Sequence, residues 1–253
     1  GYELARHTNE EVLIVYQPGV SGKEHHKGLY NNDTEIVQFE AASELAGDRM
    51  WYPITHSLSS RFGVRNCIEE TYEGHDISNV LDGAISSPVT SAVDALTTPK
   101  DNQRKFLGTI PWIHLFSIAK KLHRFIPDSM FSLPLYPLKD QEIHDGDHKE
   151  ETNIKAWGAS SMIHLRSAKH FLELDLLSDI NNAEQKYKNP LFLLTEQDRV
   201  FDVNNQEPIA DAFEAEKVFL PTGHRWFTMS REQLRGPIDS MREHRKKCLE
   251  ERL

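Results

Sequence analysis

Three residues, far apart in the chain, carry the side chains that nucleophilic acyl transfer needs. Segment 55–59 reads Thr-His-Ser-Leu-Ser and offers the hydroxyl of Ser57 as a nucleophile, while Asp198 and His224 lie much further along. A histidine can take the proton from a serine, and an aspartate can hold that histidine in the correct tautomer. The three residue types therefore predict acyl transfer through a covalent serine intermediate, provided that the fold brings them together.

Each of the three residues is expected in the segment that follows a β-strand. Parallel sheets place their active sites at the carboxyl ends of their strands, so this position favours chemistry. A serine on a tight turn between a strand and a helix exposes its hydroxyl, and the helix N-terminus supplies backbone N–H groups. The strands are predicted at 49–55 (weakened by Pro53), 190–195 and 217–220, and a helix at 59–72 follows the serine.

Simpler interpretations compete for each residue. The nucleophile-elbow pattern is G-x-S-x-G, whereas Thr55 and Ser59 flank the serine here, so Ser57 could belong to a Ser-rich helix cap. Asp198 could form an Asx turn or a cap, and Asp202 competes for its role. His224 is one of 13 histidines. What favours chemistry is the conjunction, because Ser, Asp and His occur in the chain order of the α/β-hydrolases.

The remaining pattern predicts one α/β fold with an insertion. Strands that alternate with helices indicate a mostly parallel sheet flanked by helices. The boundaries predicted from the sequence are core 1–96, a helical cap insertion 97–158 and core 159–253. Further strands are expected at 11–17 and 80–86, and helices at 34–46, 112–125 (the amphipathic stretch of the cap), 159–177, 207–215 and 230–251.

The chain resembles the lysophospholipase and monoacylglycerol-lipase family of α/β-hydrolases, a serine aminopeptidase-like group. Segment 15–22 is similar to the family's D-x-R-G-x-G-x-S turn, and 54–59 to its H-S-M-G-G elbow. Segments 81–88 and 193–200 and the pair Gly223-His224 resemble the strand after the elbow helix and the acid and base segments.

This resemblance implies a serine hydrolase that cleaves carboxylic esters of single-chain lipids. It makes Ser57, Asp198 and His224 the catalytic residues. Backbone N–H of Leu58 is expected to bind the oxyanion, and His56 and Trp112 complete the predicted oxyanion and substrate site. The cap helix that begins at Trp112 would shape an apolar slot for the acyl chain.

The resemblance also predicts a gap. In the family, strands and an oxyanion loop of the H-G-x type precede the segment that begins here at Gly1. The loss of one oxyanion donor costs on the order of 10²–10³ in turnover. The chain is therefore expected to be a fragment of a longer protein or a short form with reduced or no activity. A catalytically impaired protein that binds a lipid or a partner, and a related peptidase or small-ester esterase, are the alternatives.

Composition limits the other classes of function. A formal net charge of −10 over 253 residues argues against nucleic-acid binding, which needs a basic face. Two cysteines are too few for a disulfide framework, and no apolar run reaches the roughly 18 residues of a membrane span. We expect a cytoplasmic protein with peripheral contact to the inner membrane through the cap. We expect no cofactor and no metal, because segment 144–148 (His-Asp-Gly-Asp-His) has no second ligand cluster.

Overall fold

A parallel β-sheet forms the centre of the structure, which is a computed structural model. The residues that it describes are 11–13, 32–88, 90, 105–106, 110–111, 121, 132–134, 162–164, 174–198, 201–224 and 226–252. Four strands pair in the order β1 (Ile54–His56), β4 (Ala84–Ser86), β9 (Leu191–Thr195) and β10 (Lys217–Leu220), and every pair is parallel. The predicted fold class is therefore confirmed.

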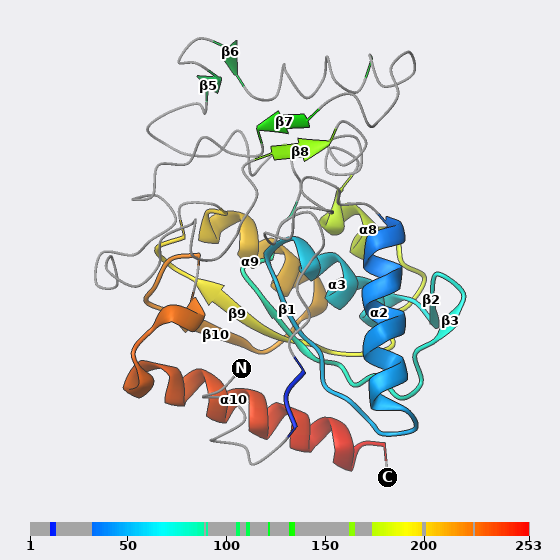
Figure 1. Cartoon of the computed structure of the whole chain (residues 1–253). Coiled ribbons are helices and arrows are strands. Elements are labelled where there is room, and N and C mark those ends of the chain that lie inside the picture. The colour runs from blue at the N-terminus through cyan, green and yellow to red at the C-terminus, as the bar shows by residue number, and fades with distance from the viewer. Residues whose placement is uncertain are drawn as a thin grey trace.

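Helices cover both faces of this sheet (Figure 1). Helix α10 (Arg231–Glu250) packs Leu234, Ile238 and Met241 against Leu191 and Leu193, which share one face of β9. The alternate residue Phe192 contacts Phe213 of α9 (Val203–Phe213) on the other face, 5.9 Å between ring centroids. All five residues of β9 are buried, as expected for a strand covered on both sides.

Helix α10 is also held to the sheet by a polar contact. His244 Nε2 donates a hydrogen bond to the Asn189 carbonyl at 2.9 Å, so its Nδ1 accepts from the Tyr52 hydroxyl at 2.9 Å. The helix begins with a capping box in which Ser230 and Gln233 satisfy each other's backbone N–H groups. No helix among the described residues is long and apolar enough to cross a membrane.

Several predicted elements are confirmed with small shifts of their ends. Helix α2 (Asn32–Ala46) ends just before Gly47, whose φ of +59° favours glycine. Strand β10 has the predicted bounds. Helix α9 begins four residues earlier than predicted, because the Asp202 side chain accepts a hydrogen bond from Asn204 N and caps it.

The two strands predicted at 49–55 and 80–86 are interrupted. Trp51 and Val80 form an isolated parallel bridge, and regular pairing resumes only at Ile54 and Ala84. The interruption lies at Pro53, which packs against Gly83. A Cβ on Gly83 would lie 2.7 Å from Pro53, and its φ is +84°.

Two predicted helices are wrong in part. Helix α3 (Ser60–Ile68) stops before 72, because Glu73 and Gly74 take positive φ values and turn the hairpin of β2 (Thr71–Tyr72) and β3 (His75–Asp76). The helix predicted at 159–177 is contradicted at β8 (Met162–His164), which pairs with β7 (Ser132–Pro134). Helix α8 (Leu176–Asn182) begins only where Asp175 caps it.

Other predictions fall mostly on residues that the structure does not describe. Of the strand predicted at 11–17, residues 11–13 are described and are not in a strand. Trp112, segment 144–148 and all of 112–125 apart from Lys121 lie outside the described residues. Within 97–158 the structure also describes the antiparallel pair β5 (Lys105–Phe106) and β6 (Ile110–Pro111).

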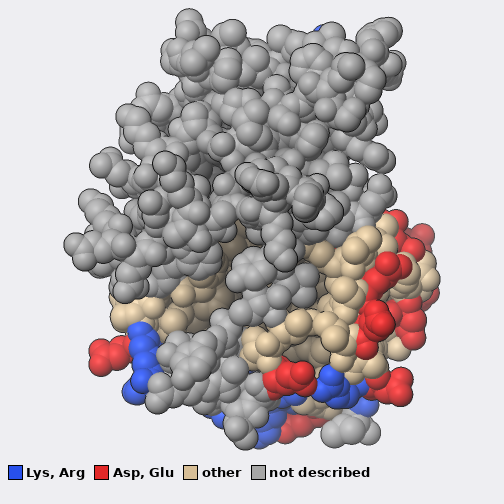
Figure 2. Space-filling view, in the orientation of Figure 1, with Lys and Arg blue, Asp and Glu red and all other residues tan. Residues whose placement is uncertain are grey.

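Acidic side chains gather on one side of the described surface. Figure 2 shows them on the side where Figure 1 places α2 and the β2–β3 hairpin. Exposed members include Glu40 and Glu44 of α2 and Glu73 and Asp76 of the hairpin. This part of the surface would repel a polyanion.

Candidate active site

Ser57 lies on a strained turn between β1 and α3. It opens the 3₁₀ turn η2 (Ser57–Ser59), which leads directly into α3. Its φ is +58°, a conformation that costs free energy for a residue other than glycine and clusters at functional sites. The local geometry is that of a nucleophile elbow, in which the serine is lifted out of the line of the strand.

Thr55, the departure from the elbow pattern, is accommodated by a glycine on the facing helix. Its side chain is buried, and a Cβ on Gly63 of α3 would lie 2.4 Å from Thr55 Oγ1. The same Cβ would lie 2.9 Å from Ile85 Cγ1 of β4. Gly63 thus provides the space that the elbow pattern normally obtains from a glycine two residues before the serine.

Ser59, the second departure, fastens the turn. Its hydroxyl accepts a hydrogen bond from His56 N at 2.8 Å and donates to His56 O at 2.7 Å. Ser59 occupies the N-cap position of α3, yet its side chain makes no cap hydrogen bond to the helix. The simpler interpretation of this segment as a Ser-rich helix cap therefore does not describe what Ser59 does.

The structure brings Ser57, His224 and Asp198 into one hydrogen-bonded chain. His224 Nε2 lies 3.1 Å from Ser57 Oγ, and His224 Nδ1 lies 2.9 Å from Asp198 Oδ2. The Asp198 side chain is fully buried and that of His224 is 11% exposed. An ionised Asp198 accepts from Nδ1–H, which leaves Nε2 to accept the serine proton. The competing residue Asp202 instead caps α9.

Asp198 receives several hydrogen bonds besides that of the histidine. Phe201 N donates to Oδ1 at 2.9 Å, and Thr195 Oγ1 lies 2.9 Å from Oδ2. Gln206 Nε2 lies 3.4 Å from the same Oδ2. These donors offset the cost of burying a carboxylate.

The His56 ring packs against the ring of His224. Their centroids are 4.7 Å apart, with the planes 45° from parallel. Ser86 Oγ donates to Thr55 O at 3.0 Å, so the single hydroxyl proton is used and His56 Nδ1 donates to Ser86 Oγ at 3.1 Å. Phe227 packs edge-on against His56 at 5.2 Å, and Phe201 against His224 at 5.2 Å. His56 is thus oriented by its neighbours and lies beside the general-base candidate.

The remaining predicted residues are Leu58 and Trp112. Leu58 follows Ser57 in η2, where the first N–H groups of a helical segment have no partner within that segment. Trp112 lies outside the described residues.

Sequence reasoning missed the residues that support the triad: Gly63, Ser86, Ser87, Thr195 and Gln206. A signal was present for three of them, because Ser86, Ser87 and Thr195 are polar residues at the ends of apolar strands.

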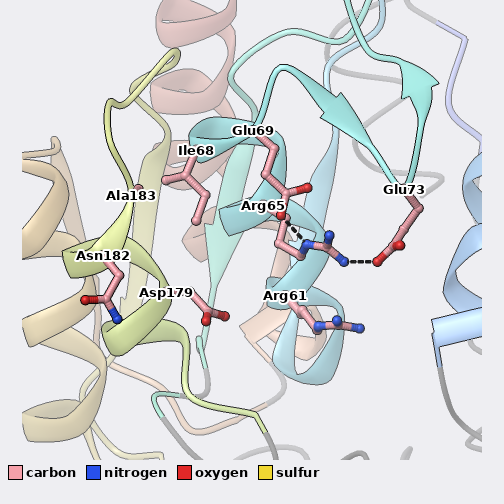
Figure 3. A pocket seen from close by; sticks show the side chains of 8 residues that line it. All are labelled: Arg61, Arg65, Ile68, Glu69, Glu73, Asp179, Asn182 and Ala183. Carbon is pink, nitrogen blue, oxygen red and sulfur yellow. Dashed lines mark hydrogen bonds and ion pairs between the residues drawn. The ribbon is translucent and has the colours of Figure 1, made fainter.

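A hollow of about 420 Å³ lies on another part of α3 (Figure 3). It is lined by Arg61, Arg65, Ile68, Glu69, Glu73, Asp179, Asn182 and Ala183, and by none of the three triad candidates. Its cations are paired, since Arg65 contacts Glu69 and Glu73, and Arg61 lies 2.9 Å from Glu35. This charged lining does not suit an acyl chain.

Solved structures with a similar fold are α/β-hydrolases. A monoacylglycerol lipase from Paleococcus ferrophilus matches with a TM-score of 0.64 and 14% identity, over 90% of this chain and 81% of that chain. A soluble variant of monoglyceride lipase from Saccharomyces cerevisiae, in complex with a substrate analog, matches with a TM-score of 0.61 and 13% identity, over 91% and 76%. A bromoperoxidase from Bacillus anthracis matches with a TM-score of 0.54 and 11% identity, over 90% and 79%.

The fold is that of the α/β-hydrolases. The chain adopts this fold, as the sheet order, the elbow and the structural matches agree. No protein-family model matches the sequence, and no curated protein matches it either.

Proposed function

We propose that the chain is a serine hydrolase that cleaves carboxylic esters of single-chain lipids, lysophospholipids or monoacylglycerols, through an acyl-enzyme. The observation that carries the proposal is the chain from Ser57 Oγ through His224 to Asp198, with contacts of 3.1 and 2.9 Å. Support for the lipid class comes from the two lipases among the structural matches.

The geometry supports a two-step mechanism. His224 Nε2 takes the proton from Ser57 Oγ as that oxygen attacks the ester carbonyl carbon. Asp198 stabilises the resulting imidazolium through Nδ1–H, and the N–H of Leu58 binds the oxyanion. When the tetrahedral intermediate collapses, the C–O bond breaks and His224 gives its proton to the leaving alcohol. Water then adds to the acyl-serine with His224 again as the base. The bond between the acyl carbon and Ser57 Oγ breaks, His224 returns the proton to Ser57 Oγ, and the fatty acid leaves.

The substrate side of the site extends the proposal. We infer that residues 97–158 form the cap, and that Trp112 and the stretch after it provide an apolar slot for the acyl chain. His56 completes the site beside His224. The protein would act in the cytoplasm, with its cap in peripheral contact with the inner membrane.

A fluorophosphonate probe and a medium-chain p-nitrophenyl ester test the serine chemistry. Wild-type protein is expected to be labelled and to turn the ester over, and Ser57→Ala is expected to do neither. Hydrolysis of monooleoylglycerol and lysophosphatidylcholine, set against a short acetate ester and a peptide p-nitroanilide, tests the lipid class. An unlabelled wild type would overturn the proposal in favour of a catalytically impaired protein that binds a lipid or a partner.

A further inference from the structure

Thr195, the last residue of β9, directs its hydroxyl proton at the acid of the triad. Its Oγ1 lies 2.9 Å from Asp198 Oδ2, the oxygen that also accepts from His224 Nδ1. Two neutral acceptors are also in reach: Ser87 Oγ at 2.9 Å, and Gln206 Oε1 at 3.4 Å, which already accepts from Thr195 N. A charged carboxylate is a stronger acceptor than a neutral hydroxyl or amide oxygen, so the proton lies toward Asp198.

Ser87 stands behind Thr195 in the same chain of hydroxyls. Its Oγ lies 2.9 Å from Thr195 Oγ1, and both side chains belong to fully buried residues. Because Thr195 has one proton and uses it on Asp198, Ser87 must be the donor in this contact. Ser87 takes a φ of +44°, a costly conformation for serine that places it just past the end of β4.

Gln206 fixes the other side of this arrangement. Its Oε1 accepts from Thr195 N at 3.2 Å, and its Nε2 donates to Phe201 O. Phe201 N in turn donates to Asp198 Oδ1 at 2.9 Å. The segment that carries Asp198 is thus tied at both ends to one buried glutamine of α9.

We propose that Thr195, with Ser87 behind it, is a positioning residue that aims Asp198 Oδ2 at His224. A carboxylate held by the histidine alone could rotate about its side-chain bonds. Thr195 Oγ1 donates to Oδ2 at 2.9 Å, the longer contact of Gln206 Nε2 reaches the same oxygen, and Phe201 N donates to Oδ1, so the plane of the carboxylate is fixed. The catalytic consequence rests on the proposed function. The orientation of Asp198 does not depend on it and can be measured separately.

The role belongs to the hydroxyl rather than to the shape of the side chain. Thr195→Val keeps the shape and loses the donor, whereas Thr195→Ser keeps the donor and loses a methyl group. Ser87→Ala removes only the donor behind Thr195. Thr71→Val, in the exposed hairpin, is the matched control for exchanging a threonine for valine.

Two measurements on the full chain test the proposal. The far-downfield proton resonance of His224 Nδ1–H, assigned by its loss in His224→Gln, reports the bond to Asp198 without any turnover. The rate of fluorophosphonate labelling reports the consequence for Ser57. Thermal unfolding of each variant monitors folding.

Thr195→Val is expected to shift the resonance upfield or abolish it and to slow labelling about tenfold, in line with a lost hydrogen bond to a charged group. Thr195→Ser and Thr71→Val should stay within about twofold of wild type, and Ser87→Ala should fall between. An unshifted resonance in Thr195→Val, or an equal loss in Thr195→Ser, would overturn the proposal, and so would a wild type without the resonance. If Thr195→Val does not fold, an unchanged resonance in Ser87→Ala would overturn it. A resonance that responds to Thr195→Val in a protein that the probe never labels would overturn the esterase and leave the positioning role standing.

Discussion

Gly63 of α3 and Thr55 of β1 pack so closely that a Cβ on the glycine would lie 2.4 Å from Thr55 Oγ1. The pair joins the helix that follows Ser57 to the strand that precedes it. The pattern of such a turn has a glycine two residues before the serine, where this chain has Thr55. Here the glycine that leaves room for the turn is Gly63 on the helix. The elbow therefore depends on two residues that are eight positions apart in the chain.

Gly63→Ala is expected to destabilise the protein by about 2 kcal/mol, because the added methyl group overpacks a buried contact. It should also slow labelling of Ser57, since the strain lies at the base of the elbow. Thr55→Ala removes the nearer obstacle, so the double variant Thr55→Ala/Gly63→Ala should recover part of the loss, and contact with Ile85 should prevent full recovery. Urea unfolding of the four proteins gives the coupling, and additive effects would contradict the proposed contact.

Asp198→Asn and Asp202→Ala test the choice of Asp198 over the competing Asp202 as the acid of the triad. Asp198→Asn is expected to lower kcat about 10⁴-fold, because an amide at this position favours the wrong histidine tautomer. Asp202→Ala removes the cap of α9 and should cost about 1 kcal/mol of stability while kcat stays within about twofold. Steady-state hydrolysis and urea unfolding measure both variants. A loss of turnover confined to Asp202→Ala would reverse the assignment.

Much of this fold can be predicted from the sequence, because strands that are buried on both faces consist of nearly continuous apolar residues. Strand β10 has the predicted bounds, and β9 differs from its prediction by one residue at its start. The predictions fail where the local sequence pattern does not determine the path of the backbone. Helical spacing continues past Ile68, yet Glu73 and Gly74 turn the chain, and the strand Met162–His164 depends on a partner about thirty residues away.

The contact of Ser57, His224 and Asp198 could also be anticipated, since each follows a strand in the expected order. Their supports were not, because they are contacts between distant segments. Ser87 meets Thr195 across 108 positions, and nothing near Thr195 in the sequence marks its partner. A polar residue at the end of a buried strand indicates such a contact, but the sequence does not identify the residue that it contacts.

His56 offers a test of positioning against substrate binding. Removal of its ring in His56→Ala takes away the surface on which His224 packs, and aromatic pairs of this kind are worth about 0.5–1.5 kcal/mol. We expect kcat to fall about three- to tenfold with KM nearly unchanged, and His56→Phe to retain part of the activity. Should KM rise while kcat holds, His56 would instead contribute uniformly to substrate binding. Ester hydrolysis over a range of substrate concentrations separates the two.

Because the Lys188 amine is largely buried, we expect the free energy of unfolding to depend on pH. This dependence is separate from catalysis. Burial lowers the pKa of its amine to about 8, while Nζ donates to Asn66 Oδ1 at 2.6 Å and to Ile77 O at 3.3 Å. In the unfolded chain the same amine keeps its proton up to a pKa of about 10.4. Between these two values the unfolded state binds more protons, so the contribution of Lys188 to the free energy of unfolding rises with pH. Below pH 8 both states are charged and the cost of burial is fully present.

The wild type should therefore gain stability relative to Lys188→Met as the pH is raised from 7 to 9.5. After a discount for partial exposure of the amine, we expect this gain to be about 1 kcal/mol. Lys246→Met, an exposed lysine of α10, is the control and should follow the wild type across the range. Urea unfolding at each pH measures all three proteins. Parallel curves for the wild type and Lys188→Met would show that the amine keeps its proton in the folded state and would contradict the lowered pKa.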